Sequence, residues 1–134
     1  MKQDFKFHET TIRVRYAETD QMGVVYYANY LVWFEVARTE YFRNLGIEYS
    51  GLEKKGIYLV VAEANCRYKA PLKYDDQIRM VTILSYIKSS SLGFKYEIFL
   101  GDRLIAIGST THAFVNKEKK PVKIPPEVFQ ALGR

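Results

Sequence analysis

The sequence predicts an α+β fold in which one long helix lies across an antiparallel sheet. Apolar side chains recur at the helical period over one long stretch, residues 28–45, and the chain after residue 57 alternates as strands do. Gly101 and Asp102 separate two of these strand patterns and have the composition of a two-residue hairpin turn. No Gly/Ser linker or repeat divides the 134 residues, so we expect a single domain over residues 1–134.

The first part of the chain is expected to hold one strand and two helices. Residues 11–16 alternate apolar and polar side chains, as a half-buried strand does. The helix predicted for residues 28–45 has one apolar face, and Gly46 can end it in the left-handed conformation. That face carries Tyr30, Phe34, Ala37, Tyr41 and Leu45. A shorter amphipathic piece, residues 49–55, is predicted to end at Gly56.

The second part is expected to contain four strands and a short terminal helix. The segments in question are rich in β-branched and aromatic residues. Strands are predicted at residues 57–64 with an extension toward 68, at 77–88, at 94–100, and from 103 to 115 or 116. Pro125 and Pro126 are suited to open a helix near the C-terminus.

Composition and charge exclude several classes of protein. The net charge of +5 comes from scattered Lys and Arg residues, so we expect no nucleic-acid partner. The longest uncharged stretch, residues 21–34, is shorter than the roughly 18–20 residues of a membrane-spanning helix. Residues 1–6 lack the apolar core of a signal peptide, and the single cysteine, Cys66, fits a reducing cytoplasm. One cysteine and two histidines are too few nitrogen and sulfur ligands for a zinc site, so none is expected.

Residues 16–30 hold the groups most suited to chemistry, in the sequence YAETDQMGVVYYANY. A carboxylate, Asp20, stands in a loop that runs through Gly23 into the start of the long helix. Because the first turn of a helix has unpaired N–H groups, it can bind an oxyanion while a nearby carboxylate attacks or activates water. The simpler interpretation is that Asp20 or Asn29 caps the helix and that Gly23 only permits a turn.

The same segment resembles the active-site motif of the 4-hydroxybenzoyl-CoA thioesterase family of the hotdog fold, in particular its YbgC-like acyl-CoA thioesterase branch. The matching residues are Asp20, Gly23, Val24, Val25, Tyr26, Tyr27 and Tyr30. Residues 68–76 resemble the family's segment between its second and third strands, and residues 121–125 resemble its usual ending. The resemblance implies one long central helix wrapped by a curved five-stranded antiparallel sheet.

The resemblance also implies roles for individual residues. Asp20 would act on the thioester carbonyl, as a nucleophile or as a general base for water, and the backbone N–H of Tyr27 would donate to the carbonyl oxygen. Gly23, Val24 and Tyr30 would border the substrate. Many YbgC-like members carry a histidine at the position of Tyr27, so no mechanism that needs an imidazole is expected here.

Basic residues would hold the phosphates of coenzyme A. In some family members, basic residues in the hairpin between two long strands contact these phosphates. The corresponding residues here would be Lys88 and Ser89. Arg67 and Lys69 are weaker candidates for the same contact. The alternative for a lysine at a hairpin is that it is only solvated.

The remaining polar residues have weaker links to the reaction. Glu18 is expected at the surface or behind Asp20, and Cys66 is expected to be buried. His112 is interpreted as a packed or interface residue. Glu35 and Glu40 are expected to pair with arginines of the same helix, with Glu35 a minor candidate for a second catalytic carboxylate.

The predicted function is hydrolysis of acyl-CoA thioesters to a carboxylic acid and coenzyme A, by an enzyme without metal or cofactor. A hydratase or dehydratase of the same fold would need a histidine paired with a carboxylate, and neither His8 nor His112 stands in such a motif. A non-enzymatic acyl-CoA-binding protein would lack Asp20. The resemblance further implies a dimer of hotdog units, its assembly into a tetramer, and a partner among envelope or phospholipid-synthesis proteins.

Overall fold

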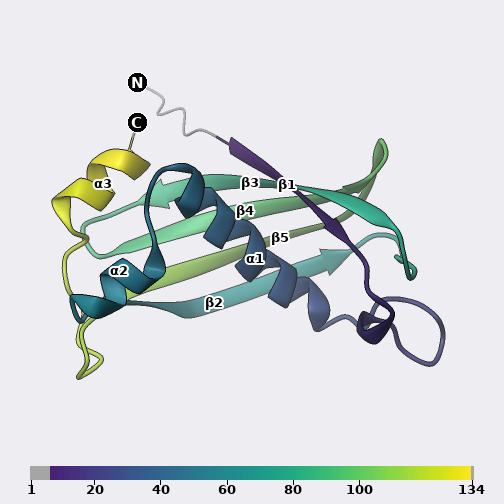
Figure 1. The fold of residues 1–134 in the computed structure, drawn as a ribbon, viewed down its shortest axis with the longest axis horizontal. Coiled ribbons are helices and arrows are strands. Elements are labelled where there is room, and N and C mark those ends of the chain that lie inside the picture. The colour runs from purple at the N-terminus through teal and green to yellow at the C-terminus, as the bar shows by residue number, and fades with distance from the viewer. Residues whose placement is uncertain (1–6, 134) are drawn as a thin grey trace.

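The computed structural model describes residues 7–133 as a five-stranded sheet with a long helix against it (Figure 1). The expectation about a signal peptide concerned residues 1–6, which lie outside the described residues. None of the helices in the described part is long and apolar enough to span a membrane. The strands are β1 (Phe7–Arg13), β2 (Tyr58–Tyr68), β3 (Gln77–Ile87), β4 (Ser91–Leu100) and β5 (Arg103–Val115). The helices are the 3₁₀ turn η1 (Tyr16–Glu18), α1 (Asn29–Asn44), α2 (Tyr49–Lys54) and α3 (Pro126–Leu132).

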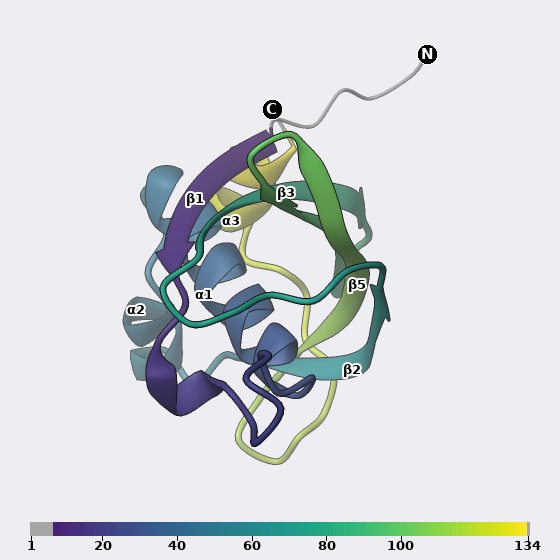
Figure 2. The ribbon, with the colours of Figure 1, turned by 90° about the vertical axis from the view of Figure 1, so that its right-hand side faces the viewer.

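The sheet has the strand order β1-β3-β4-β5-β2, and every neighbouring pair is antiparallel. It curves around α1, which lies along its inner face (Figure 2). The outer edge of β1 and the outer edge of β2 are therefore the two edges of the sheet. This arrangement confirms the predicted α+β class and the five curved antiparallel strands around one helix.

The first strand is the element that the sequence predicted least well. It begins at Phe7 rather than at residue 11 and ends at Arg13 rather than at residue 16. Val14 leaves the strand to donate a hydrogen bond to the carbonyl of Asp76 (2.8 Å), and the chain then turns into η1. The alternation of side chains continued past the strand because Val14 is buried although it lies in a loop.

Packing of α1 into the sheet forms the core. Phe34 stacks on Tyr96 of β4, with 4.3 Å between ring centroids and 9° between ring planes. The same ring lies against Gly108 of β5, where a Cβ atom would overlap it. A residue without a side chain in the middle of β5 thus lets α1 approach the sheet closely. The buried residues of α1 are Tyr30, Trp33, Phe34, Ala37, Arg38, Tyr41 and Phe42.

We expect Gly108→Ala to destabilise the protein by about 1–3 kcal/mol, because the added methyl group must displace the Phe34 ring or the strand. Urea unfolding measures the difference. Gly51→Ala is the matched control: a Cβ at Gly51 meets nothing within 4 Å, and alanine favours the helix α2. Equal stabilities of the two variants would contradict the close approach of α1.

A buried polar group lies in the same core. The hydroxyl groups of Tyr96 and Thr110 are 2.6 Å apart, and Nε2 of His112 lies 2.7 Å from the Thr110 hydroxyl. Arg38 of α1 lies beside Tyr96. Burial, followed by the charge of Arg38, lowers the pKa of His112 from 6.5 to about 4. His112 is 1% exposed, which confirms its interpretation as a packed residue.

Protonation of His112 is expected to destabilise the protein in acid. Since its pKa is about 4 when folded and near 6.5 when unfolded, the unfolded chain takes up the proton first as the pH falls. The free energy of unfolding then falls between pH 6.5 and pH 4, by at most about 1.4 kcal/mol per pH unit. Urea unfolding across this range should show a smaller dependence of the unfolding free energy on pH for His112→Gln than for the wild type. An unchanged slope in His112→Gln would refute this account.

Candidate active site

The loop that carries Asp20 is a small antiparallel hairpin. Thr19 and Val25 form an isolated β-bridge, and the Asp20 N–H donates to the carbonyl of Val24 (2.8 Å). Gly23 has φ +81°, a left-handed conformation that a side chain would oppose. The hairpin is tied to the body of the protein where the Val25 N–H donates to the carbonyl of Leu72 (2.8 Å).

The carboxylate of Asp20 is exposed at this hairpin. Its Oδ1 atom accepts hydrogen bonds from the Met22 N–H (2.8 Å) and the Val24 N–H (3.4 Å). Both donors belong to the loop itself, so the loop orients the side chain without any contact to α1. Asp20 is thus a carboxylate with a defined direction and free access to water.

The start of α1 offers an unpaired donor. The Tyr27 N–H has no acceptor among residues 7–133, and α1 has no side-chain cap. Asn29 instead donates from Nδ2 to the carbonyl of Glu18 (2.8 Å). The interpretation that Asp20 or Asn29 merely caps the helix is therefore wrong, and the first turn is left open to an external acceptor.

Tyrosine rings surround that open turn. The Tyr68 hydroxyl, at the end of β2, donates to the carbonyl of Tyr27 (3.0 Å), and the two rings lie 6.4 Å apart. Tyr30 packs edge-on against Tyr68 with 4.8 Å between centroids, and Tyr26 lies 4.7 Å from Tyr27. Sequence reasoning placed Tyr27 and Tyr30 here but missed Tyr68. Its signal was its position at the start of the segment 68–76, which resembled the same family.

The surroundings of the cluster disfavour ionisation of its phenols. Burial raises the pKa of both Tyr30 and Tyr68 to about 12, further above neutral pH than the ordinary phenol value near 10. Burial also raises the pKa of the neighbouring Cys66 thiol. Cys66 is half-buried, less than expected, and nothing in its surroundings activates it as a nucleophile.

The residues predicted to hold coenzyme A lie elsewhere in the chain. Lys88 and Ser89 form the turn between β3 and β4, where the Lys88 N–H donates to the carbonyl of Ser91 (2.8 Å). Asp20 lies near the opposite end of β3, roughly 30 Å away along a strand of this length. Arg67 lines a hollow of about 390 Å³ among β2–β5 together with Lys95. One chain alone therefore does not bring Lys88 to Asp20.

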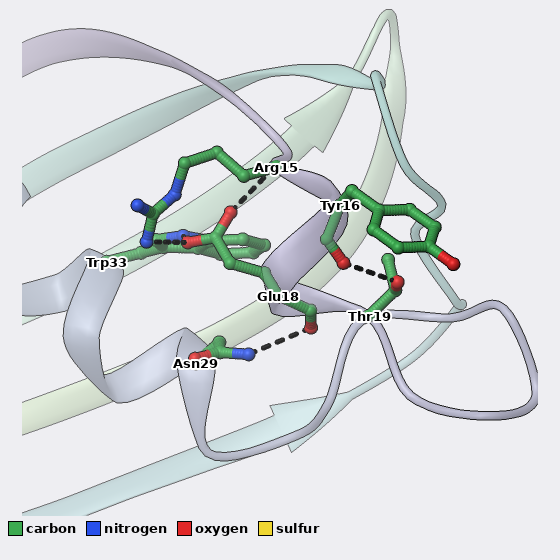
Figure 3. Close-up of polar contacts among 6 residues, drawn as sticks. All are labelled: Arg15, Tyr16, Glu18, Thr19, Asn29 and Trp33. Carbon is green, nitrogen blue, oxygen red and sulfur yellow. Dashed lines mark hydrogen bonds and ion pairs between the residues drawn. The ribbon is translucent and has the colours of Figure 1, made fainter.

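The other acidic residues also have defined places. Glu18 is 6% exposed, which excludes the first of its two expected positions, at the surface, and leaves the second, behind Asp20. Its carboxylate binds Arg15 and Trp33 (Figure 3). Glu40 forms the expected ion pair with Arg43, and Glu35 is exposed on α1. Within the described residues, no three His, Cys, Asp or Glu side chains gather as they would to hold a metal ion.

Comparisons with known proteins agree with this arrangement. Residues 14–132 match the model of the Thioesterase-like superfamily. The chain is 43% identical to YneP of Bacillus subtilis over 114 residues, which cover 84% of this chain and 83% of YneP. It is 35% identical to the acyl-CoA thioesterase YbgC of Haemophilus influenzae, over 90% of each chain. A solved structure of a DHNA-CoA thioesterase from Staphylococcus aureus superposes with a TM-score of 0.90 at 36% identity, covering 93% of this chain and 87% of that one.

A curved antiparallel sheet around one long helix is the hotdog fold, which thioesterase-like proteins share. The chain belongs to the Thioesterase-like superfamily, because the family match covers nearly all of the described residues. The resemblance to YbgC-like proteins that the motif suggested is confirmed by relatives at 34–43% identity.

Proposed function

We propose that the protein hydrolyses acyl-CoA thioesters, releasing a carboxylic acid and coenzyme A. The observation that carries the proposal is an exposed carboxylate in the loop that leads directly to an unpaired backbone donor. Asp20 extends from one hairpin, and the Tyr27 N–H follows directly after that hairpin at the start of α1. The family match and the thioesterase relatives support the same reaction.

In the reaction the thioester oxygen would accept a hydrogen bond from the Tyr27 N–H, where the positive end of the α1 dipole also favours negative charge. As a general base, Asp20 takes a proton from a water molecule while the water oxygen attacks the carbonyl carbon. The tetrahedral intermediate collapses, the C–S bond breaks, and the thiolate of coenzyme A takes the proton. As a nucleophile, Asp20 would instead form a mixed anhydride that water hydrolyses to the same products. A backbone oxyanion donor contributes on the order of 10²–10³ in rate.

Asp20→Asn is expected to lower kcat by about 10²–10⁴, since the amide can neither take the proton nor attack the carbonyl. Thiol release should be measured for a panel of short and long aliphatic acyl-CoAs and for benzoyl-CoA and hydroxybenzoyl-CoA. The aromatic substrates are included because of the tyrosines around Tyr27 and the DHNA-CoA relative.

The matched control for this variant is Asp102→Asn, which alters an exposed aspartate in the turn between β4 and β5. It should hydrolyse every substrate at the wild-type rate. Full activity of Asp20→Asn on every substrate that the wild type accepts would refute the proposed function.

We further propose that the active unit is a homodimer joined at β2. Among residues 7–133 no strand pairs with the outer edge of β2, which is eleven residues long, and natural proteins usually cover or protect an exposed edge of this kind. Val60 and Val61 on β2, together with Val32 and Val36 on α1, are all exposed apolar side chains. Pairing with a second copy would bury both sets.

Antiparallel pairing of two β2 strands would also complete the site. It sets the start of one β2 beside the end of the other, and Tyr68 at that end contacts Tyr27. The end of the partner sheet that holds its turn between β3 and β4 then lies toward Asp20. This geometry supports Lys88 and Ser89 as contacts to coenzyme A across the dimer. A tetramer, a single domain over residues 1–134, a cytoplasmic location and an envelope or phospholipid-synthesis partner remain predictions.

Mixed dimers test whether Lys88 acts across the interface. Lys88→Ala is expected to raise KM for an acyl-CoA by up to about fivefold, the value of one exposed charge pair. In a mixed dimer, one subunit carries Asp20→Asn and the other carries Lys88→Ala. If each site takes Asp20 from one subunit and Lys88 from its partner, one of the two sites keeps both wild-type groups. If each site takes both groups from the same subunit, neither site does. We expect wild-type KM at half the wild-type kcat.

Lys117→Ala, in an exposed turn, is the control for the loss of a charge. A raised KM in the mixed dimer would place Lys88 in its own subunit's site. An unchanged KM in the Lys88→Ala homodimer would show that Lys88 does not contact the substrate.

A further inference from the structure

Glu18 joins the two groups that the proposed reaction needs. Its backbone carbonyl accepts the Tyr26 N–H (2.9 Å), which closes the base of the Asp20 hairpin. The same carbonyl accepts Nδ2 of Asn29 (2.8 Å), the first residue of α1. The carbonyl of Glu18 therefore joins two parts of the chain. It holds Tyr26, next to Tyr27 at the base of the Asp20 hairpin, and Asn29, at the start of α1.

The side chain of Glu18 adds a second attachment. Its Oε2 atom accepts the indole N–H of Trp33 (2.9 Å), one turn further along α1. Its Oε1 atom accepts the Arg15 N–H (2.8 Å), and the Arg15 guanidinium lies 3.4 Å from Oε2. Figure 3 shows these contacts converging on Glu18 from η1 and α1. The carboxylate is 6% exposed.

Hydrogen-bond donors meet both oxygens of the Glu18 carboxylate. Both oxygens accept hydrogen bonds from donors that have no other acceptor in the described residues. A glutamine would turn an NH₂ group toward one of those donors and leave it unsatisfied. Burying a charge is costly unless donors surround it, as they do here.

We propose that Glu18 is a positioning residue, which holds the Asp20 hairpin and the Tyr27 peptide in register at the start of α1. This inference rests on the proposed hydrolysis at Asp20. Glu18 itself is not a catalytic residue, because both of its oxygens are occupied and it is shielded from solvent. Its effect is exerted on geometry, where a displacement of about 1 Å can cost 10²-fold in rate.

Glu18→Gln is therefore expected to lower kcat by about 10²-fold and to change KM by less than about twofold. The loss falls on kcat because Glu18 fixes the relative position of Asp20 and the Tyr27 N–H, the two groups proposed to act on the reacting carbonyl. Glu40→Gln makes the same chemical change in an ion pair near the other end of α1 and should leave both constants unchanged. A wild-type kcat in folded Glu18→Gln would overturn the proposal, and so would a loss confined to KM.

Trp33 supplies a direct spectroscopic readout, because it is the only tryptophan of the chain. Its fluorescence emission should shift in Glu18→Gln, where the indole loses its charged acceptor, and should not shift in Glu40→Gln. Unshifted emission in Glu18→Gln would overturn the contact on which the proposal depends.

Trp33→Phe keeps the inference testable if Glu18→Gln does not fold. It removes the donor to Oε2, retains an aromatic ring, and should lower kcat several-fold at constant KM. A wild-type kcat in this variant would overturn the proposal. Asp20→Asn in the same assay separates the two claims: activity in Asp20→Asn defeats the proposed function, whereas an inactive Asp20→Asn beside a fully active Glu18→Gln defeats only the positioning role.

Discussion

The packing of α1 against the curved sheet determines where the groups at the start of the helix lie. Phe34 stacks on Tyr96 and occupies the space that a side chain at Gly108 would fill, so the helix can neither slide nor lift without losing that contact. With its middle fixed, α1 must begin near the end of β2, where Tyr68 reaches the carbonyl of Tyr27. The open first turn of the helix is thereby supported by packed structure on both sides. A polarising group held in this way needs little reorganisation when charge develops on a substrate.

The electrostatics of the site follow from the same arrangement. The donor is a backbone N–H, which stays protonated, and the nearby phenols of Tyr30 and Tyr68 have pKa values of about 12. Two carboxylates stand close together in the sequence, but they have different surroundings. Glu18 is enclosed by donors and accompanied by Arg15, whereas Asp20 is exposed and held only by its own loop. The two carboxylates therefore differ in what they can contact: Glu18 meets donors of the protein, whereas Asp20 is open to solvent.

Local patterns explain most of what the sequence predicted. The helical period placed α1 to within one residue at each end, and the Gly101–Asp102 turn correctly separated β4 from β5. The motif pointed to the loop and helix start because its residues are contiguous. The sequence could not decide whether Glu18 is exposed or buried, because its partner Trp33 lies fifteen residues further on and no spacing rule links a carboxylate before the helix to the helix's second turn. The distance between Lys88 and Asp20 was also hidden, since it depends on the length and direction of β3.

The separation of Lys88 from Asp20 would give the edge strand β2 a role in completing the proposed site as well as in stability. A site that draws its carboxylate from one end of the sheet and its phosphate contacts from the other cannot be completed within one hotdog unit. The proposed antiparallel pairing at β2 would reverse one sheet against the other and so bring the β3–β4 turn of the second copy toward Asp20. Tyr68 is the last residue of that strand and also the donor to Tyr27. Contacts that order the edge of the sheet would therefore order the start of α1 as well, so assembly at β2 and preparation of the oxyanion site would depend on the same residue.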